Sequence, residues 1–481
     1  MGNPPFIGGQ KLTGALGTDY REYLVNRLGG GQRGSADLCA YFLLRNLALA
    51  PGRRTGIIAT NTIAQGDTRE VGLDQATAAG WTVYRAIKSQ PWPGTAALEV
   101  SLLWLGGSAG KDEQPVLDGD EVRGITPGLD PRSRVSGKPY RLAANAGQSF
   151  QGSNVLGKGF VLQPEVAQAL IEKDPRNKDV LFPYLNGEDL NSRPDCSASR
   201  WVINFHGWSE EKAATYEDVF AIVERDVKPV RLANNRKVYR DFWWQYGEKR
   251  PAMVRTISDL DRVIVIALVS KTAVPVRQAT TQVFSHMLGV FATDSAAQLA
   301  LLSGSLHYWW AVQHGSSLKG DLRYTPSDVY DTFPKPRETN RLATAGDTLE
   351  KIQRDAMASQ AIGLTKLYNA IHAGAAHSAS AEAVRQAHVE VDEAVAEACG
   401  WTDLNLRHGI HETRQGTRPT ISPDAQVEVL DRLLELNHAR YKEEQEAGLH
   451  VPGAKKKAAP KRAPKPKAEP KPEDGIQDGF F

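Results

Sequence analysis

The tetrapeptide Asn3-Pro4-Pro5-Phe6 is the feature that most restricts how this chain can fold. Each proline ring fixes its own φ, and the residue before a proline is pushed out of the helical region, so the segment must form a stiff loop. One interpretation is a rigid turn with no further role. The other is a loop that presents chemical groups: the carboxamide oxygen of Asn3 and the carbonyl of Pro4 can accept hydrogen bonds, and Phe6 offers an aromatic face.

The second interpretation suits an exocyclic amine as substrate. The lone pair of an adenine N6 amine is delocalised into the ring, which makes the amine a poor nucleophile. Two acceptors that hold its N–H groups can aim the lone pair at a methyl donor, by orientation and preorganised electrostatics and without a covalent intermediate. A base flipped out of a duplex can stack on the aromatic ring. The loop therefore predicts Asn3, Pro4, Pro5 and Phe6 as catalytic residues of a methyl transfer.

Residues 1–115 show the alternation of helix and strand that is typical of an open α/β sheet. A helix is predicted over residues 35–50, with Ser35 as its N-cap and Pro51-Gly52 as its end. Apolar runs at residues 55–60 and 100–105 predict buried strands. Asp37 and Asn61 are candidates to line a pocket, and Asp37 can equally be a first-turn acid that complements the helix dipole.

The composition and the predicted secondary structure change along the rest of the chain. Residues 116–140 are rich in Gly, Pro and Asp and predict a linker. Residues 141–337, with short strands, aromatics and one helix at about 295–314, predict a mixed α+β domain. Residues 338–450 predict an all-α domain with helices over 349–371, 381–398 and 425–441. The Lys/Pro/Ala-rich residues 451–481 predict a disordered basic tail.

Charge is clustered rather than spread over the chain. With 58 Lys+Arg against 56 Asp+Glu, any nucleic-acid site must come from local clusters. Residues 225–255 hold nine Lys/Arg and three acids, interleaved with Tyr239, Phe242, Trp243, Trp244 and Tyr246. Such a face suits DNA phosphates, although a solvated helix face has the same pattern. The candidate backbone contacts are Arg236, Lys237, Arg240, Lys249 and Arg250.

Lys319, Asp321 and Arg323 are the candidates for reading DNA bases. Residues two apart in a strand point the same way, so all three can project into one groove. Lys or Arg donates to guanine O6 and N7, while Asp accepts from cytosine N4, which matches the trio to a G·C pair. An exposed, salt-bridged strand is the competing interpretation.

Several classes of protein are excluded. Three separated cysteines (Cys39, Cys196 and Cys399) form no CxxC pair, which excludes a disulfide framework and a thiolate zinc cluster. His408 and His411 have no carboxylate or thiol partner nearby in the sequence, so we expect no metal site. The most apolar short run, Val263 to Val269, is far shorter than the roughly 20 residues of a spanning helix. We therefore expect a soluble, cytoplasmic protein without a membrane partner.

These motifs together resemble the MmeI-like adenine-specific DNA methyltransferases, the methylase part of single-chain restriction-modification enzymes. The likeness is carried by Asn-Pro-Pro-Phe-Ile-Gly-Gly (3–9), Tyr-Arg-Glu-Tyr-Leu (20–24), Ser-Ala-Asp-Leu (35–38), Gly-Ile-Ile-Ala-Thr-Asn (56–61), Trp-Pro-Gly (92–94), Phe-Pro-Tyr-Leu-Asn-Gly-Glu-Asp (182–189), Trp-Val-Ile-Asn-Phe (201–205), Gly-Glu-Lys-Arg-Pro (247–251) and Phe-Ser-His (284–286). Residues 318–334, 367–369 and 430–441 extend it almost to the tail.

The resemblance implies a fold, a cofactor and a partner. Residues 1–115 would be the C-terminal half of a class I methyltransferase sheet, S-adenosyl-L-methionine the methyl donor, and double-stranded DNA the partner. It also implies base reading from the region of Lys319. Trp92 stands where such enzymes place a second aromatic ring that sandwiches the extruded adenine, although a partly buried Trp in a surface turn fits equally well.

The resemblance also implies parts that this sequence does not show. Family members bind the cofactor through a glycine-rich loop and a strand-end acid, both before the Asn-Pro-Pro segment, and only two residues precede Asn3 here. The glycine-rich segments at 106–110 and 152–159 lack the strand-loop-helix context. No cluster of acids and Lys suits a nuclease. We therefore expect a truncated, split or late-started product, inactive alone, with a separate polypeptide supplying the cofactor-binding half or a nuclease.

Two other functions stay open from the sequence. One is a DNA sequence-recognition module without catalysis of its own, in which Asn3 to Phe6 is a relic. The other is a methyltransferase that acts on protein or RNA, because the same tetrapeptide pattern serves there.

Overall fold

The structure is a computed structural model of the 481-residue chain. It describes residues 2–32, 35–49, 51–93, 98–107, 113–132, 134–318, 321–373, 379–411, 413 and 416–450. The predicted basic tail, 451–481, and Lys319 lie outside the described residues. The buried apolar side chains gather in one core between Leu12 and Leu129, a second between Val155 and Tyr246, and a larger third between Leu185 and Leu434.

The first core covers one face of a mixed sheet with strand order β1-β3-β2-β4-β5. Its strands are β1 (Arg54–Thr60), β2 (Thr82–Pro91), β3 (Glu99–Gly106), β4 (Val116–Leu117) and β5 (Asp120–Glu121). The predicted strands at 55–60 and 100–105 are β1 and β3. Because β3 runs antiparallel to both β1 and β2, the latter two run in the same direction and end at the same edge of the sheet. Gly2 forms a parallel bridge with Ile57, which brings the opening residues to that edge.

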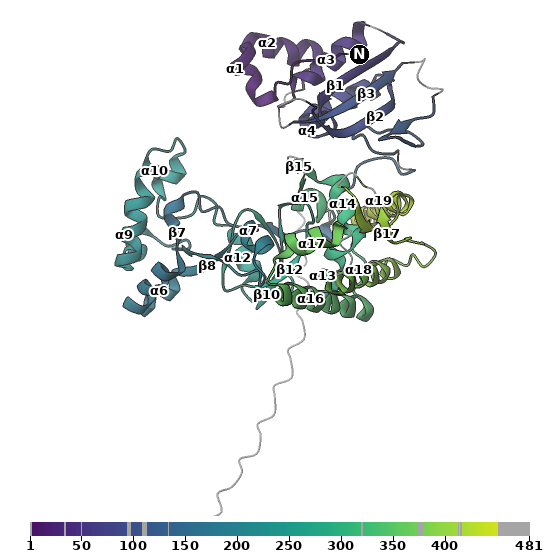
Figure 1. The fold of residues 1–481 in the computed structure, drawn as a ribbon. Helices are drawn as coiled ribbons and strands as arrows, with labels where there is room; N and C mark the ends of the chain where they lie inside the picture. Colours follow the sequence, from purple (N-terminus) through teal and green to yellow (C-terminus); the bar gives the residue numbers. More distant parts are fainter. Residues whose placement is uncertain are drawn as a thin grey trace, which may run out of the picture.

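Short helices surround this sheet (Figure 1). They are η1 (Gly9–Lys11), α1 (Leu12–Leu16), α2 (Thr18–Tyr23), η2 (Leu24–Leu28), α3 (Leu38–Leu49), η3 (Asn61–Ala64), α4 (Gly66–Arg69), η4 (Glu70–Asp74) and α5 (Gln75–Ala78). The helix predicted from Ser35 is α3, which begins three residues later, so Ser35 is not its N-cap. A Cβ on Gly9 would lie 2.1 Å from the Ser35 carbonyl oxygen, so the opening segment packs directly on this stretch and keeps it out of the helix.

Residues 141–337 form a mixed α+β region with three sheets. Their strand orders are β12-β10-β14-β6, β13-β8-β9-β7 and β11-β16-β15. The strands are β6 (Ser149–Gln151), β7 (Val161–Leu162), β8 (Leu181–Leu185), β9 (Arg200–Ile203), β10 (Arg262–Ala267), β11 (Val269–Ser270), β12 (Val276–Ala279), β13 (Val283–Phe284), β14 (Leu288–Phe291), β15 (Ser316–Leu318) and β16 (Asp321–Arg323).

The helices of this region divide between a side arm and the main body. The side arm projects from the body in Figure 1 and comprises β7, β8, β9 and the elements α6 (Pro164–Lys173), η8 (Pro175–Asp179), α8 (Glu210–Ala214), α9 (Glu217–Asp226), α10 (Lys228–Leu232) and α11 (Lys237–Asp241). The body contains η6 (Ala143–Asn145), α7 (Gly187–Ser192), α12 (Pro251–Ile257), α13 (Ala296–Ser303), α14 (Ser305–His314) and α15 (Pro326–Val329); η7 (Lys158–Phe160) leads into the side arm.

The last region is mainly helical but not all-α. Its helices are α16 (Asn340–Gln360), α17 (Leu364–His372), α18 (Ala379–Ala398) and α19 (Pro423–Glu446), and β17 (Gly409–His411) pairs with β18 (Arg418–Thr420). α16 packs on α13 and α18, and α19 packs on α14. The largest core therefore crosses residue 337, because amphipathic helices need a surface to cover and the preceding sheet provides it. The predicted boundary at 337/338 does not separate two cores.

Two helices predicted as continuous are interrupted where the backbone meets a distant segment. The run at 295–314 breaks at Gly304, because Asp392 accepts the Ser305 N–H at 2.5 Å and occupies the position beside the glycine. The run at 349–371 breaks before Gly363, where a Cβ would lie 2.3 Å from the carbonyl carbon of Ser192. None of the helices in the described part of the chain combines the length and apolar character that a membrane crossing requires.

Candidate functional site

The opening loop, Asn3 to Phe6, is fastened to the edge of the first sheet. Gly2 donates to the Gly56 carbonyl at 2.8 Å and accepts from the Ile58 N–H at 2.9 Å. Pro4 is buried, whereas Asn3 is exposed. The loop is thus anchored through its first proline and leaves the Asn3 carboxamide accessible.

Asp37 holds the chain that follows this loop. One carboxylate oxygen accepts the Gly9 N–H at 2.9 Å, and the other accepts the hydroxyl groups of Thr60 and Thr62 at 3.0 and 2.6 Å. These contacts tie the opening segment to the start of α3 and the end of β1. Asp37 therefore positions the opening segment. It directly precedes α3, and its expected roles as a pocket residue or as an acid at the helix start stay predictions. The sequence did not point to Thr60 and Thr62, although hydroxyl residues at the end of a predicted strand are a usable signal.

Phe6 and Trp92 come together from distant segments. Their ring centroids are 5.8 Å apart and their planes meet at 87°, an edge-to-face contact. Trp92 directly follows β2 and donates its backbone N–H to the Leu98 carbonyl at 2.8 Å. The sequence patterns predict neither β2 nor its place next to β3, so the proximity of these two rings appears only in the structure.

The sheet register explains why these groups share one edge. Val100 on β3 pairs with Thr60 on one side and with Gln90 on the other. Asn61, the first residue of η3, and Trp92 therefore follow two strands that end side by side. With the opening loop attached to β1, the structure brings Asn3, Phe6, Asn61 and Trp92 to the same edge of the sheet.

The glycine-rich segments serve close backbone packing. A Cβ on Gly107 would lie 2.7 Å from the Gly52 Cα, and one on Gly159 would lie 2.6 Å from the Asp226 Cβ. Residues 152–159 lead from β6 only into η7, a single turn of 3-10 helix followed by β7, and residues 108–110 lie outside the described part of the chain. The described residues therefore do not fit a nucleotide-cofactor cradle.

The basic segment 225–255 is partly interior. Trp243, Trp244 and Tyr246 are at most 7 % exposed and belong to the core of the side arm, so they do not line a DNA face. Arg231 is also buried and donates through Nη2 to the carbonyls of Val155 and Gln245 at 2.9 and 3.1 Å. Burial lowers the pKa of this guanidinium. The expected alternation of cations and surface aromatics is wrong for these four residues. Arg231 lies on the buried side of α10, and the turn after α11 directs Trp243, Trp244 and Tyr246 into the core of the side arm.

The five candidate backbone contacts differ in accessibility. Arg236, Lys237 and Lys249 are exposed, whereas Arg240 and Arg250 are half-buried. Arg240 donates to the Asn234 carbonyl at 2.6 Å, and Arg250 binds Gln151 and Glu248. The first three are therefore the better placed to meet a phosphate backbone.

Asp321 and Arg323 lie on the same side of β16. Leu322 between them is 5 % exposed and points into the core, so the alternation places the two charged side chains together, as predicted. β16 is held between β11 and β15.

Asp130 links the first sheet to the body. Its carboxylate binds Lys88 of β2 and accepts from Nε2 of Gln313 on α14 at 2.7 Å. Asp130 is 5 % exposed. The contact fixes β2, and with it the position of Trp92, relative to residues 141–337.

The two histidines considered as metal ligands have other partners. His408 pairs with Asp392 of α18 at 3.0 Å, a carboxylate partner that its sequence neighbourhood did not reveal. His411 contacts the Arg407 carbonyl at 3.2 Å. Among the described residues, no group of three His, Cys, Asp or Glu side chains is placed to hold a metal ion.

Comparison with known proteins identifies the middle region. Residues 141–337 match the family model of the MmeI target recognition domain, with the same bounds as the predicted domain. The chain therefore contains a target recognition region of the kind found in restriction-modification enzymes. One solved structure that the chain resembles is that of MmeI, a Type IIL restriction-modification enzyme, in complex with DNA: it matches with a TM-score of 0.68 and 17 % identity over 92 % of this chain. At this identity the likeness shows a shared fold.

The match covers only part of the MmeI chain. This chain covers 57 % of the MmeI chain. The type IIG restriction endonuclease BpuSI matches with a TM-score of 0.28 and 12 % identity, over 82 % of this chain and 53 % of that chain, which is too distant to support an argument. A search of curated proteins found no match.

Proposed function

We propose that this chain carries the substrate loop and the target recognition domain of a site-specific DNA adenine N6-methyltransferase of a restriction-modification system. S-adenosyl-L-methionine is the expected methyl donor, bound by a cofactor segment in the same longer chain or in a second polypeptide. The observation that supports the proposal most directly is the meeting of the Asn3 loop with the Phe6–Trp92 pair at one edge of an α/β sheet. A target recognition domain follows in the same chain.

The proposed role of the loop is to hold the amine. The Asn3 carboxamide oxygen and the Pro4 carbonyl each accept one N6–H group of adenine, which directs the nitrogen lone pair toward the donor. The buried Pro4 ring and the Asp37 contacts keep these acceptors in place.

The proposed role of the two aromatic rings is to receive the flipped base. A base between two stacked rings needs about 7 Å between their planes, twice the usual contact distance of carbon atoms. Phe6 and Trp92 stand closer, at 5.8 Å, and edge to face. Because the two rings occupy each other's space, we expect Trp92 to turn aside when adenine enters.

DNA would be held by two surfaces. Arg236, Lys237 and Lys249 would contact phosphates, each adding to a salt-dependent affinity. Asp321 and Arg323 would read base edges from β16. Double-stranded DNA as the partner is supported by the MmeI complex. The match to a target recognition domain of that enzyme favours DNA over protein or RNA as substrate.

The test is methylation of duplex DNA by the chain joined to, or mixed with, its cofactor segment. The parent should form N6-methyladenine at a defined sequence, and Asn3→Ala should slow the reaction about 10²-fold or more, as loss of a preorganised polar contact does elsewhere. Gln10→Ala, an exposed change just beyond the loop, serves as the matched control and should methylate normally. Equal rates for Asn3→Ala and the parent would refute the proposal.

A second function is favoured by the bounds of the family match, which covers residues 141–337 and not the sheet. In that case the chain recognises a DNA sequence without catalysis. Tight, sequence-specific binding by the parent and by Asn3→Ala, with no methylation after the cofactor segment is supplied, would identify it.

A further inference from the structure

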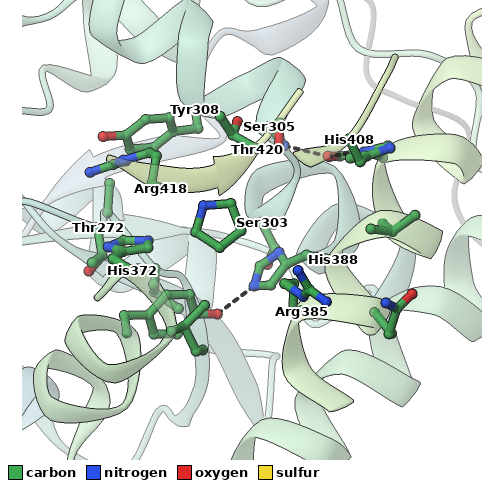
Figure 2. A pocket seen from close by; sticks show the side chains of 18 of the residues that line it. Thr272, Ser303, Ser305, Tyr308, His372, Arg385, His388, His408, Arg418 and Thr420 are labelled. Carbon is green, nitrogen blue, oxygen red and sulfur yellow. Dashed lines mark hydrogen bonds and ion pairs between the residues drawn. The ribbon is translucent and has the colours of Figure 1, made fainter. Parts of the chain in front are cut away.

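A cavity of about 350 Å³ is lined by residues other than those of the opening loop and the proposed DNA contacts. It opens between the loop after β11, the helices α14, α17 and α18, and the β17–β18 hairpin (Figure 2). Its volume falls in the range of small-ligand pockets. Because α14 belongs to the recognition domain and α17, α18 and the hairpin follow it, a ligand here would bridge the two regions.

Basic side chains line the cavity from three elements. Arg418 of β18 is 5 % exposed, stacks over the Tyr308 ring at 4.8 Å and donates to the Lys271 carbonyl at 3.5 Å. Arg385 lies on α18, where Glu382 binds its Nη2. His372 contributes an imidazole from α17. Two fixed positive charges and an imidazole therefore border one small space.

The polar side chains around His372 are hydrogen-bonded to one another, whereas the His372 ring has no hydrogen-bond partner among the described residues. Tyr368 donates to Nε2 of His388 at 2.6 Å and accepts from Gln353 at 3.2 Å, which fixes His388. Within the described residues, the His372 ring makes no hydrogen bond. Burial, the Arg418 charge and His388 together lower the pKa of His372 to about 4. His372 is thus a neutral hydrogen-bonding group that faces a cation across the cavity.

Negative charge in the lining is limited. Asp392 is the one acid among the described lining residues, and its two oxygens are taken by the Ser305 N–H at 2.5 Å and by His408 at 3.0 Å. A metal ion would face two guanidinium groups and be repelled. An oxyanion would be attracted by both and could accept hydrogen bonds from Arg418 and His372. Ile371, Val274 and Val389 provide an apolar wall beside them.

We propose that this cavity binds a small ligand with an oxyanion head, a phosphate or a carboxylate, held by Arg418, His372 and Arg385, with any apolar part against Ile371 and Val389. Such a ligand would stabilise the junction of the recognition domain with the helical region. The inference does not depend on methyl transfer, so it can fail or succeed independently of the proposed function.

The experiment measures thermal unfolding of the full chain during titration with sodium phosphate or sodium benzoate, against sodium chloride at equal ionic strength. A ligand that binds only the folded state raises the midpoint in a saturable manner. The phosphate and benzoate arms distinguish the two oxyanion heads. We expect a saturable rise of a few degrees with at least one of them, and none with chloride.

His372→Gln and Arg385→Gln should each weaken binding about tenfold or more, because each removes a hydrogen bond or a charge from the oxyanion. Arg354→Gln, at an exposed position of α16 where Arg354 pairs with Glu350, is the matched control and should bind as the parent does. Circular dichroism shows whether each variant folds, and either cavity variant alone decides the question. No saturable rise with either probe, or equal binding by the parent and a folded cavity variant, would overturn the proposal.

Discussion

The rings of Phe6 and Trp92 meet edge to face at a centroid distance of 5.8 Å, although Phe6 belongs to the opening loop and Trp92 directly follows β2. The contact exists because β3 lies between β1 and β2 and runs against both, so the strand ends that carry these segments share an edge. The arrangement makes the aromatic pair a test of the base-binding hypothesis.

Replacing Trp92 by Ala should weaken binding of the target base by about 1–3 kcal/mol, the usual contribution of base–aromatic stacking. The effect should appear as slower methylation of the target sequence, with little change in binding of non-target DNA. Trp92→Phe keeps an aromatic face and should restore most of the rate. Methylation by Trp92→Ala at the parent rate would show that the ring does not contact the base.

Asp37→Asn should destabilise the first sheet and displace the opening loop. An amide cannot accept on both sides as the carboxylate does, so the Gly9 N–H or the threonine hydroxyls lose a partner. We expect a loss of about 1–3 kcal/mol in the free energy of unfolding, measured with denaturant. Asp19→Asn, in the first turn of exposed α2, should leave that free energy unchanged.

Asp130→Ala should loosen the attachment of the first sheet to the body. It leaves Lys88 without its carboxylate and removes the bond to Gln313, and breaking such a buried pair costs about 3 kcal/mol. Hydrogen exchange along β2 and α14 should become faster, while β10 in the large core keeps its protection. Unchanged exchange along β2 would show that other contacts fix the sheet.

Stability should fall as the pH drops from about 6.5 to about 4. Burial lowers the pKa of His307, His314 and His372 to about 4 from 6.5, so the unfolded chain binds more protons in this window. The stabilisation is complete above pH 6.5 and is lost as the unfolded state becomes protonated. Each histidine contributes about 3 kcal/mol to this loss.

His307 offers the sharpest check of the pH effect. Its Nδ1 lies 3.1 Å from the Leu302 carbonyl, which can only accept, so Nδ1 carries the proton and Nε2 accepts from Tyr324. His307→Gln should therefore reduce the difference in unfolding free energy between pH 6.5 and pH 4.5, whatever its effect at neutral pH. An unaltered difference would show that His307 does not titrate on unfolding.

Base reading and phosphate binding should separate in mutants. Asp321→Arg should change which base is accepted at one position of the recognition sequence, because an acceptor becomes a donor. Lys237→Gln should weaken binding to all sequences alike and lower the salt dependence by about one counterion. Binding assays on a library of DNA duplexes, repeated at several salt concentrations, measure both the base preference and the salt dependence. If the recognition sequence is unchanged in Asp321→Arg, Asp321 does not read a base.

The local features of this protein follow from the order of its residues. Two prolines fixed the opening loop, apolar runs predicted β1 and β3, and helical periodicity predicted the main helices after residue 337. The predicted bounds of the recognition domain, 141–337, agree with the family match. These features depend on neighbours in the chain, which the sequence lists in order.

Which distant segments meet, by contrast, depends on how the folded chain packs. Because β3 lies antiparallel between β1 and β2, Trp92 comes to lie beside Phe6. Packing of the side arm buries Trp243 and Trp244 in its core. Asp392 split the predicted helix at Gly304 and paired with His408, so one acid shaped both a helix end and a cavity wall. Periodicity predicts which face of a helix or strand is apolar. The segment that covers this face comes from elsewhere in the chain, so a local pattern cannot predict which segment it is.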